Sequence, residues 1–178
     1  YNSTLIFISK PFLMATLSVA FWLEMGLKNK FSQFIFGALL FSIGGDTLLM
    51  FVENGGGELF FLLGLGSFLI THVFYFFAFY HCRKVENGLL KKRPILALPL
   101  LLYFLVFSGF LFPSIKSEMQ IPVAVYSLTI IAMALACLNL YSKIDRATFS
   151  LLFIGVLLFV CSDSIIAINK FKSAQLTL

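Results

Sequence analysis

Charged residues are scarce in this chain, where they make up 12% of 178 residues. A soluble domain has about 25% charged and about 45–50% apolar residues. Here 60% of the residues are hydrophobic, and the mean hydropathy is +0.99. Because so few charges cannot cover a surface that faces water, the composition excludes an ordinary soluble globular protein.

Cysteine and histidine are also few. The three cysteines, Cys82, Cys137 and Cys161, form no CxxC pair, and two of them lie within apolar runs, as buried cysteines do. The two histidines, one of them at a membrane boundary, do not make a His-rich zinc centre. We therefore expect neither a metal nor a cofactor.

Long hydrophobic runs dominate what is present. Six of them, at residues 4–23, 34–52, 59–80, 95–113, 121–141 and 149–168, are close to the roughly 20 residues that cross a bilayer as a helix. The connectors are short, and the one at 53–58, ENGGGE, predicts a tight turn. The sequence thus predicts an all-α polytopic transmembrane bundle, with residues 1–178 as one domain.

Lysine and arginine are distributed unevenly among the connectors. Those after the first, third and fifth runs hold nine: Lys28, Lys30, Arg83, Lys84, Lys91, Lys92, Arg93, Lys143 and Arg146. The opposite side holds three: Lys116, Lys170 and Lys172. The positive-inside rule places the nine in the cytoplasm and both chain ends outside. We expect these residues to orient the protein and not to bind nucleic acid.

Polar groups inside the runs are candidates for a functional site, because burying them in a membrane is costly. At 1.5 Å per residue, four lie roughly 8–9 Å below the outer boundary: Lys10, Asp46, Tyr126 and Asp163. His72 lies deeper, and Tyr75 follows it on the same helix face. The shared depth predicts a pocket that opens toward the outer leaflet.

Two readings of this polar layer are open. Lys10 could pair with one aspartate and hold helices together, at about 1–2 kcal/mol or less. A functional site is favoured because one lysine cannot neutralise both Asp46 and Asp163. A carboxyl group without a charged partner tends to stay protonated in a low dielectric, as a general acid must.

The two aspartates also lie in similar segments. FGALLFSIGGDTLL (36–49) resembles FIGVLLFVCSDSII (153–166), with Gly37 and Gly155 aligned and a one-residue slip before the aspartate. A parallel internal duplication would make the aspartates paired members of one site. Chance similarity between two helices rich in Leu and Phe is the alternative.

Five motifs occur in order along the chain: Lys10-Pro11, Gly45-Asp46, FLLGLGSFLITHVFY with Gly64, Phe68, His72 and Tyr75, then Pro122 with Tyr126, and GVLLFVCSDSIIAINKF with Ser162, Asp163, Ser164 and Asn169. Together they resemble the YhhN-type lysoplasmalogenases, which are integral membrane enzymes, and this resemblance extends over essentially the whole chain. It implies an eight-helix fold, of which this segment would lack one helix at each end.

The resemblance also implies an activity, hydrolysis of the vinyl ether bond of a lysoplasmalogen. The products would be a fatty aldehyde and glycerophosphocholine or glycerophosphoethanolamine. Asp46 and Asp163 would be catalytic, with Asp163 slightly favoured as the acid. The substrate contacts would come from Lys10, His72, Tyr75, Tyr126, Ser162 and Asn169.

Other function classes fit parts of the pattern. Proton-coupled carriers and lipid-binding proteins also use intramembrane acids, although no pair of broken helices at matched positions is visible here. A purely structural membrane subunit would need the aspartates for assembly only. In every case we expect a multi-pass membrane protein, in the cell membrane of a bacterium or an endomembrane of a eukaryote.

Overall fold

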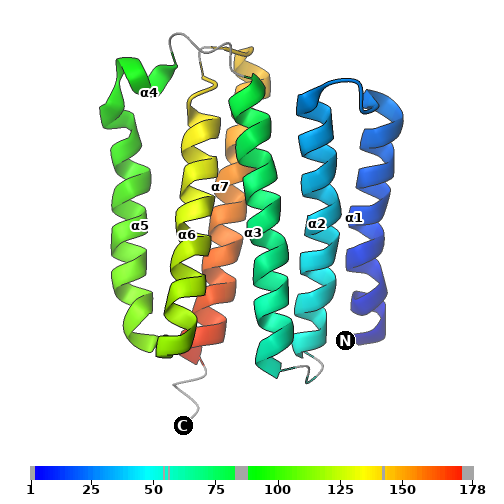
Figure 1. Ribbon diagram of the computed structural model, residues 1–178, viewed down its shortest axis with the longest axis vertical. Helices are drawn as coiled ribbons and strands as arrows, with labels where there is room; N and C mark the ends of the chain where they lie inside the picture. The colour runs from blue at the N-terminus through cyan, green and yellow to red at the C-terminus, as the bar shows by residue number, and fades with distance from the viewer. Residues whose placement is uncertain (1–2, 54, 56, 83–87, 142, 174–178) are drawn as a thin grey trace. The chain divides into compact units, whose positions relative to one another are not determined.

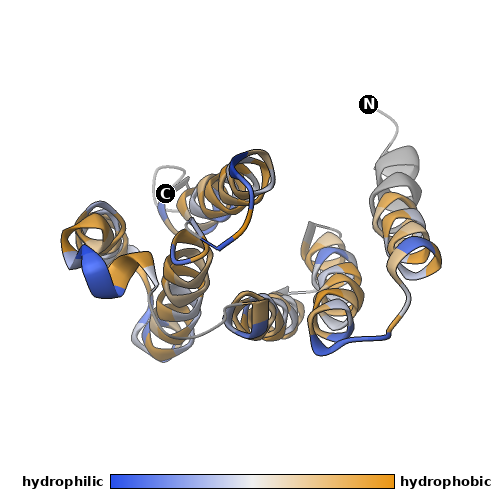
Figure 2. Ribbon diagram, turned by 90° about the horizontal axis from the view of Figure 1, so that it is seen from above, coloured by the Kyte–Doolittle hydropathy of each residue, from blue (hydrophilic) through white to orange (hydrophobic). Residues whose placement is uncertain are grey.

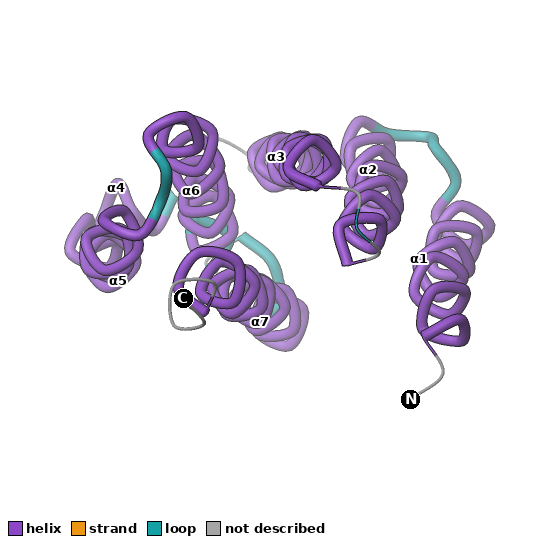
Figure 3. Tube along the Cα trace, turned by 90° about the horizontal axis from the view of Figure 1, so that it is seen from below, coloured by secondary structure: helices purple, strands orange, loops and turns teal. Residues whose placement is uncertain are grey.

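The structure is a computed structural model that describes residues 3–53, 55, 57–82, 88–141 and 143–173, with side chains described from residue 12 onward except those of Glu53 and Ser173. The described residues form helices joined by short loops, and no strand occurs among them (Figure 3). Figure 1 labels the α-helices in chain order. They are α1 (Ser3–Met25), α2 (Lys30–Glu53), α3 (Gly57–Cys82), α4 (Leu89–Lys92), α5 (Leu98–Leu111), α6 (Ser117–Leu138) and α7 (Arg146–Ile168).

The first compact unit, Tyr1–Cys82, contains three antiparallel helices. α1 ends at Met25, and Gly26 after it closes the helix with a positive φ of 60° while its N–H bonds to the carbonyl of Trp22 at 2.9 Å. Asn29 then caps α2, because its side-chain oxygen accepts from the Ser32 N–H at 2.8 Å. These local signals determine where the chain reverses, and α2 packs between α1 and α3 (Figure 1).

The predicted tight turn between α2 and α3 is confirmed. α2 ends at Glu53 and α3 begins at Gly57, with positive φ values of 92° at Gly55 and 71° at Gly57. Residues with a Cβ rarely adopt such angles, so the glycines permit the reversal. Residues 54 and 56 lie outside the described part of the chain.

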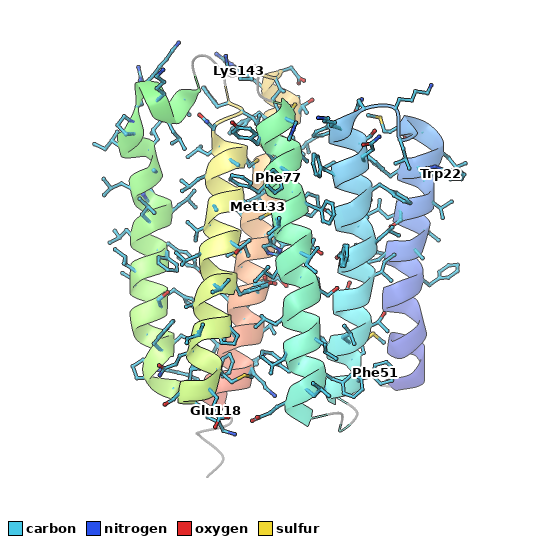
Figure 4. All side chains as sticks on the ribbon, in the orientation of Figure 1. Trp22, Phe51, Phe77, Glu118, Met133 and Lys143 are labelled. Carbon is cyan, nitrogen blue, oxygen red and sulfur yellow. The ribbon has the colours of Figure 1, made fainter. Side chains whose placement is uncertain are left out.

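The second compact unit, Arg83–Leu178, contains α5, α6 and α7, and α6 packs against both of the others. Asp145 caps α7 by accepting from the Thr148 N–H at 2.9 Å. Asn139 holds the segment before α5 in place. Its buried side chain accepts from the Leu90 N–H at 3.1 Å, and Gly88 lies directly against the same side chain. Glu118 and Lys143 mark opposite ends of this unit (Figure 4).

The predicted runs fall in helices except for the last three residues of the fifth, and several boundaries differ. The fourth run is divided into a 3-10 turn (Pro94–Ala97), α5, and a second 3-10 turn (Phe112–Ser114), because prolines lie near both ends. The second and fifth helices each start four residues earlier than predicted, and the fifth ends three residues earlier, at Leu138, so that Pro122 lies inside α6 and not at its start. The apolar periodicity alone does not show that the polar stretch from Ser117 is helical.

Five helices are long and apolar enough to cross a membrane: Lys30–Val52, Gly57–Cys82, Pro94–Ser114, Ser117–Leu138 and Arg146–Lys172. The described part of α1 adds a shorter apolar helix, Phe12–Met25. Within each unit the helices are hydrophobic along most of their length, and hydrophilic residues gather toward the connectors (Figure 2). Large apolar side chains such as Leu105 and Val106 are each 65% exposed, as suits contact with lipid. The protein is a multi-pass integral membrane protein.

Candidate functional site

In the first unit, small residues bring α2 and α3 close together beside Asp46. A Cβ on Gly45 would lie 2.6 Å from the ring of Phe68, and a Cβ on Gly64 would lie 3.5 Å from the Gly45 carbonyl oxygen. Hydroxyl groups add hydrogen bonds across the same interface, from Ser67 to the Phe41 carbonyl at 2.6 Å and from Thr71 to the Ala38 carbonyl at 3.3 Å. Membrane helices commonly pack through small residues in this way.

Asp46 and His72 are both positioned by this interface. Asp46 follows Gly45 on α2 and is half-buried. His72 on α3 is completely buried, and its Nδ1 lies 2.6 Å from the carbonyl oxygen of Phe68, one turn earlier. A carbonyl can only accept, so Nδ1 carries the hydrogen, and Nε2 of a neutral ring is then the acceptor. Tyr75, half-buried one turn further along, stacks on Phe79 with ring centroids 6.1 Å apart.

In the second unit, the structure brings two predicted site residues into direct contact. Tyr126 on α6 is 9% exposed, and its hydroxyl donates a hydrogen bond to Oδ2 of Asp163 on α7. The partner helix thereby determines the orientation of the carboxyl group. Sequence reasoning placed both residues at one depth, and their contact agrees with that placement.

The residue after Asp163 makes a second contact between helices, which sequence reasoning missed. Tyr103 on α5 bonds to the Oγ of Ser164 on α7. Ser164 in turn donates to the carbonyl of Val160 at 2.6 Å. The sequence does indicate such a contact, because Tyr103 lies halfway along an apolar run, where a hydroxyl group needs a hydrogen-bond partner.

Of the remaining predicted site residues, two are exposed and one has a side chain that is not described. Ser162 is exposed. Asn169 is also exposed, and it lies where α7 passes into a π-helical turn, Asn169–Ser173. Such turns are often found at functional sites. Lys10 belongs to α1, but its side chain lies outside the described residues.

The two aligned glycines of the suspected duplication have different surroundings. A Cβ on Gly37 would lie 2.9 Å from the ring of Phe74, whereas nothing in the described structure lies within 4 Å of a Cβ on Gly155. The duplication therefore stays a prediction. No three His, Cys, Asp or Glu side chains gather in the part of the chain that the structure describes, so no metal ligands are assigned.

What the described groups can do follows from their chemistry. Each unit presents one aspartate within a membrane-spanning helix, and each aspartate lies on a helix that contacts a neighbour. A carboxyl group within an apolar span can give a proton to a substrate or stabilise a cation. Imidazole and phenol groups, such as those of His72 and Tyr126, can orient a polar ligand or a water molecule.

Comparison with known proteins identifies one family. The chain matches the YhhN family over residues 5–177, nearly its whole length. Neither a search of curated proteins nor a search of solved structures found a match.

Proposed function

The chain belongs to the YhhN family, and we propose that it is a hydrolase that cleaves the vinyl ether bond of lysoplasmalogens within the membrane. The observation that carries this proposal is the contact between Tyr126 and Asp163, because it orients a carboxyl group inside an apolar span. The family is associated with lysoplasmalogenase activity, and that association supplies the substrate class.

The reaction requires one proton donor and one water molecule. A carboxylic acid protonates the β-carbon of the vinyl ether, which gives an oxocarbenium ion. Water adds to the carbon that bears oxygen and loses a proton to a carboxylate, which gives a hemiacetal. The hemiacetal then collapses: its hydroxyl proton leaves, the ether oxygen takes up a proton, and a fatty aldehyde and a glycerophospho-alcohol separate. Atoms balance with water as the only co-reactant.

We assign the acid and the stabilising carboxylate to Asp46 and Asp163. A preorganised carboxylate stabilises a developing cation more effectively in a dry site than in water. The two roles are assigned to the pair and not divided between its members. Tyr126 orients Asp163. Lys10, His72, Tyr75, Ser162 and Asn169 are proposed to contact the substrate.

The test is product release by the purified full chain in detergent. We expect aldehyde and glycerophospho-alcohol from a lysoplasmalogen, and no aldehyde from a lysophospholipid whose chain is a saturated ether. Asp46→Asn and Asp163→Asn should each lower the rate at least about a hundredfold, the scale of general acid catalysis. Asp145→Asn is the matched control, because it makes the same change at the cap of α7 and Asn also caps helices.

Other results would point elsewhere. A folded wild-type protein that binds the lipid without releasing aldehyde would contradict the hydrolase and favour a carrier or lipid-binding protein. Full activity in both folded Asp46→Asn and Asp163→Asn variants would contradict the carboxylate mechanism while leaving the reaction itself in place.

A further inference from the structure

Tyr103 and Ser164 form a hydrogen bond with a defined direction. Ser164 has one hydroxyl hydrogen, and its Oγ donates it to the Val160 carbonyl at 2.6 Å. The hydrogen between the two hydroxyls must then come from Tyr103, with Ser164 as the acceptor. The phenol of Tyr103 on α5 therefore donates to Ser164 on α7, and Ser164 is itself hydrogen-bonded to a carbonyl of its own helix.

This contact is adjacent to the candidate catalytic group. Asp163 and Ser164 are consecutive, so their side chains leave α7 in directions about 100° apart. One is held by Tyr126 of α6 and the other by Tyr103 of α5. One contact alone would allow α7 to turn about it, whereas two in different directions determine the rotation of the helix.

We propose that Tyr103 is a positioning residue of the hydrolytic site, which through Ser164 holds α7 in the rotation that presents Asp163 to Tyr126. The expected effect on the rate rests on the proposed function, whereas the expected effect on the rotation of α7 rests on the two hydrogen bonds alone. A side-chain atom lies about 5–6 Å from the helix axis, so a turn of about 10° would move the carboxyl by about 1 Å. A displacement of that size can cost about a hundredfold in rate.

Two ordinary explanations account for the tyrosine less well. Tyrosines in membrane proteins concentrate in belts at the two interfaces. Tyr103, however, lies near the middle of its span, Pro94–Ser114. The residue is also 37% exposed, so filling of the core does not explain it. A purely structural hydrogen bond would stabilise the unit without affecting Asp163, and the experiment is designed to separate these two roles.

The experiment measures kcat and KM for aldehyde release together with a signal from Tyr126. For the signal, 3-fluorotyrosine is introduced at position 126 only, so that its fluorine resonance reports the contact with Asp163; Asp163→Asn calibrates the loss of that contact. The test variants are Tyr103→Phe, Ser164→Ala and their combination. The matched controls are Tyr141→Phe, beyond the end of α6, and Ser150→Ala, whose hydroxyl bonds to the Arg146 carbonyl on the same helix.

We expect Tyr103→Phe to lower kcat about tenfold with KM within about twofold, because orientation affects the transition state more than binding. The fluorine resonance should move toward its position in Asp163→Asn. The double variant should resemble either single variant, and both controls should resemble the wild type. Ser164→Thr keeps a hydroxyl, so it should retain the signal; Ser164→Ala, which removes the acceptor, decides between the two roles if Tyr103→Phe fails to fold.

An unchanged fluorine resonance in folded Tyr103→Phe would overturn the inference, whatever the kinetics show. If the wild type releases no aldehyde, the proposed hydrolase fails. The resonance alone then decides whether Tyr103 positions Asp163.

Discussion

At the scale of single residues, the phenol of Tyr126 and the carboxyl group of Asp163 are in direct contact. Both residues are polar groups on membrane-spanning helices, and each satisfies the other. Buried polar groups are costly unless they are hydrogen-bonded, so the pair is retained at little cost. The same contact limits the carboxyl group to one orientation, as preorganised catalysis requires.

Removing only the phenolic hydroxyl of Tyr126 tests this role. Tyr126→Phe keeps the ring in its buried position but leaves Asp163 without that hydrogen bond. We expect the rate of aldehyde release to fall about tenfold or more, with a loss of stability of about 1 kcal/mol. Steady-state kinetics and thermal unfolding in detergent measure the two effects. A wild-type rate in the folded variant would show that Tyr126 does not orient Asp163.

Asp145, outside the membrane span, gives a prediction about pH. The pKa of its carboxyl group lies below the usual value, because the side chain and then the backbone N–H of Thr148 bond to it. A group whose pKa is lowered by folding contributes stability above its unfolded pKa, and the contribution disappears as the pH falls through the folded value. The affected window therefore lies below about pH 4.

We expect the wild type to unfold at a higher temperature than Asp145→Ala near pH 7, and the difference to shrink as the pH falls below about 4. Asp145→Asn caps the helix without titrating, so its difference from Asp145→Ala should be nearly independent of pH. Thermal unfolding of the three proteins across this range is the measurement. A wild-type advantage that stays constant down to pH 2 would contradict the assignment.

At the scale of elements, α2 and α3 approach each other closely because glycine, which has no side chain, lies at their interface. Gly45 faces the ring of Phe68, which is 7% exposed and has no room to swing away. Gly66, on α3, has nothing within 4 Å of a Cβ in the described structure. The two glycines therefore predict opposite responses to the same substitution.

Gly45→Ala should destabilise the protein by about 1–3 kcal/mol, because the added methyl forces the helices apart. Gly66→Ala should be neutral or stabilising by up to about 1 kcal/mol, since alanine favours a helix over glycine. Unfolding midpoints of both variants in the same detergent check this. Equal effects would mean that close approach of α2 and α3 is not what Gly45 permits.

The sequence predicts these elements well and their contacts only in part. Runs of apolar residues show where the helices lie, because a membrane requires length and hydrophobicity. Their ends depend on caps and prolines, so the polar start of α6 was missed. The depth argument grouped Tyr126 with Asp163 correctly, but the bond between Tyr103 and Ser164 depends on helix rotation, and apolar periodicity around a lipid-exposed helix determines rotation poorly.

At the scale of the whole molecule, the uneven distribution of lysine and arginine predicts an orientation in the bilayer. Lys143 and Glu118 lie at opposite ends of the second unit (Figure 4), and Lys143 belongs to the basic side. The positive-inside rule then places Lys143 in the cytoplasm and Glu118 outside.

Cysteine labelling tests this orientation. With the native cysteines replaced by alanine, Glu118→Cys should react with an impermeant maleimide in intact cells, and Lys143→Cys only after permeabilisation. Leu105→Cys, within the span Pro94–Ser114, is the control that should react poorly in both conditions. Reversed reactivity of the two end positions would contradict the orientation and with it a pocket that opens toward the outer leaflet.

The reaction itself is tested most directly by the mass of the aldehyde formed in D2O. Protonation of the vinyl ether at its β-carbon predicts that the aldehyde released from a lysoplasmalogen carries one deuterium on the carbon next to the carbonyl, and that folded Asp163→Asn releases little of it. An aldehyde without deuterium, or no aldehyde from the folded wild type, would contradict acid-catalysed hydrolysis as the function of this protein.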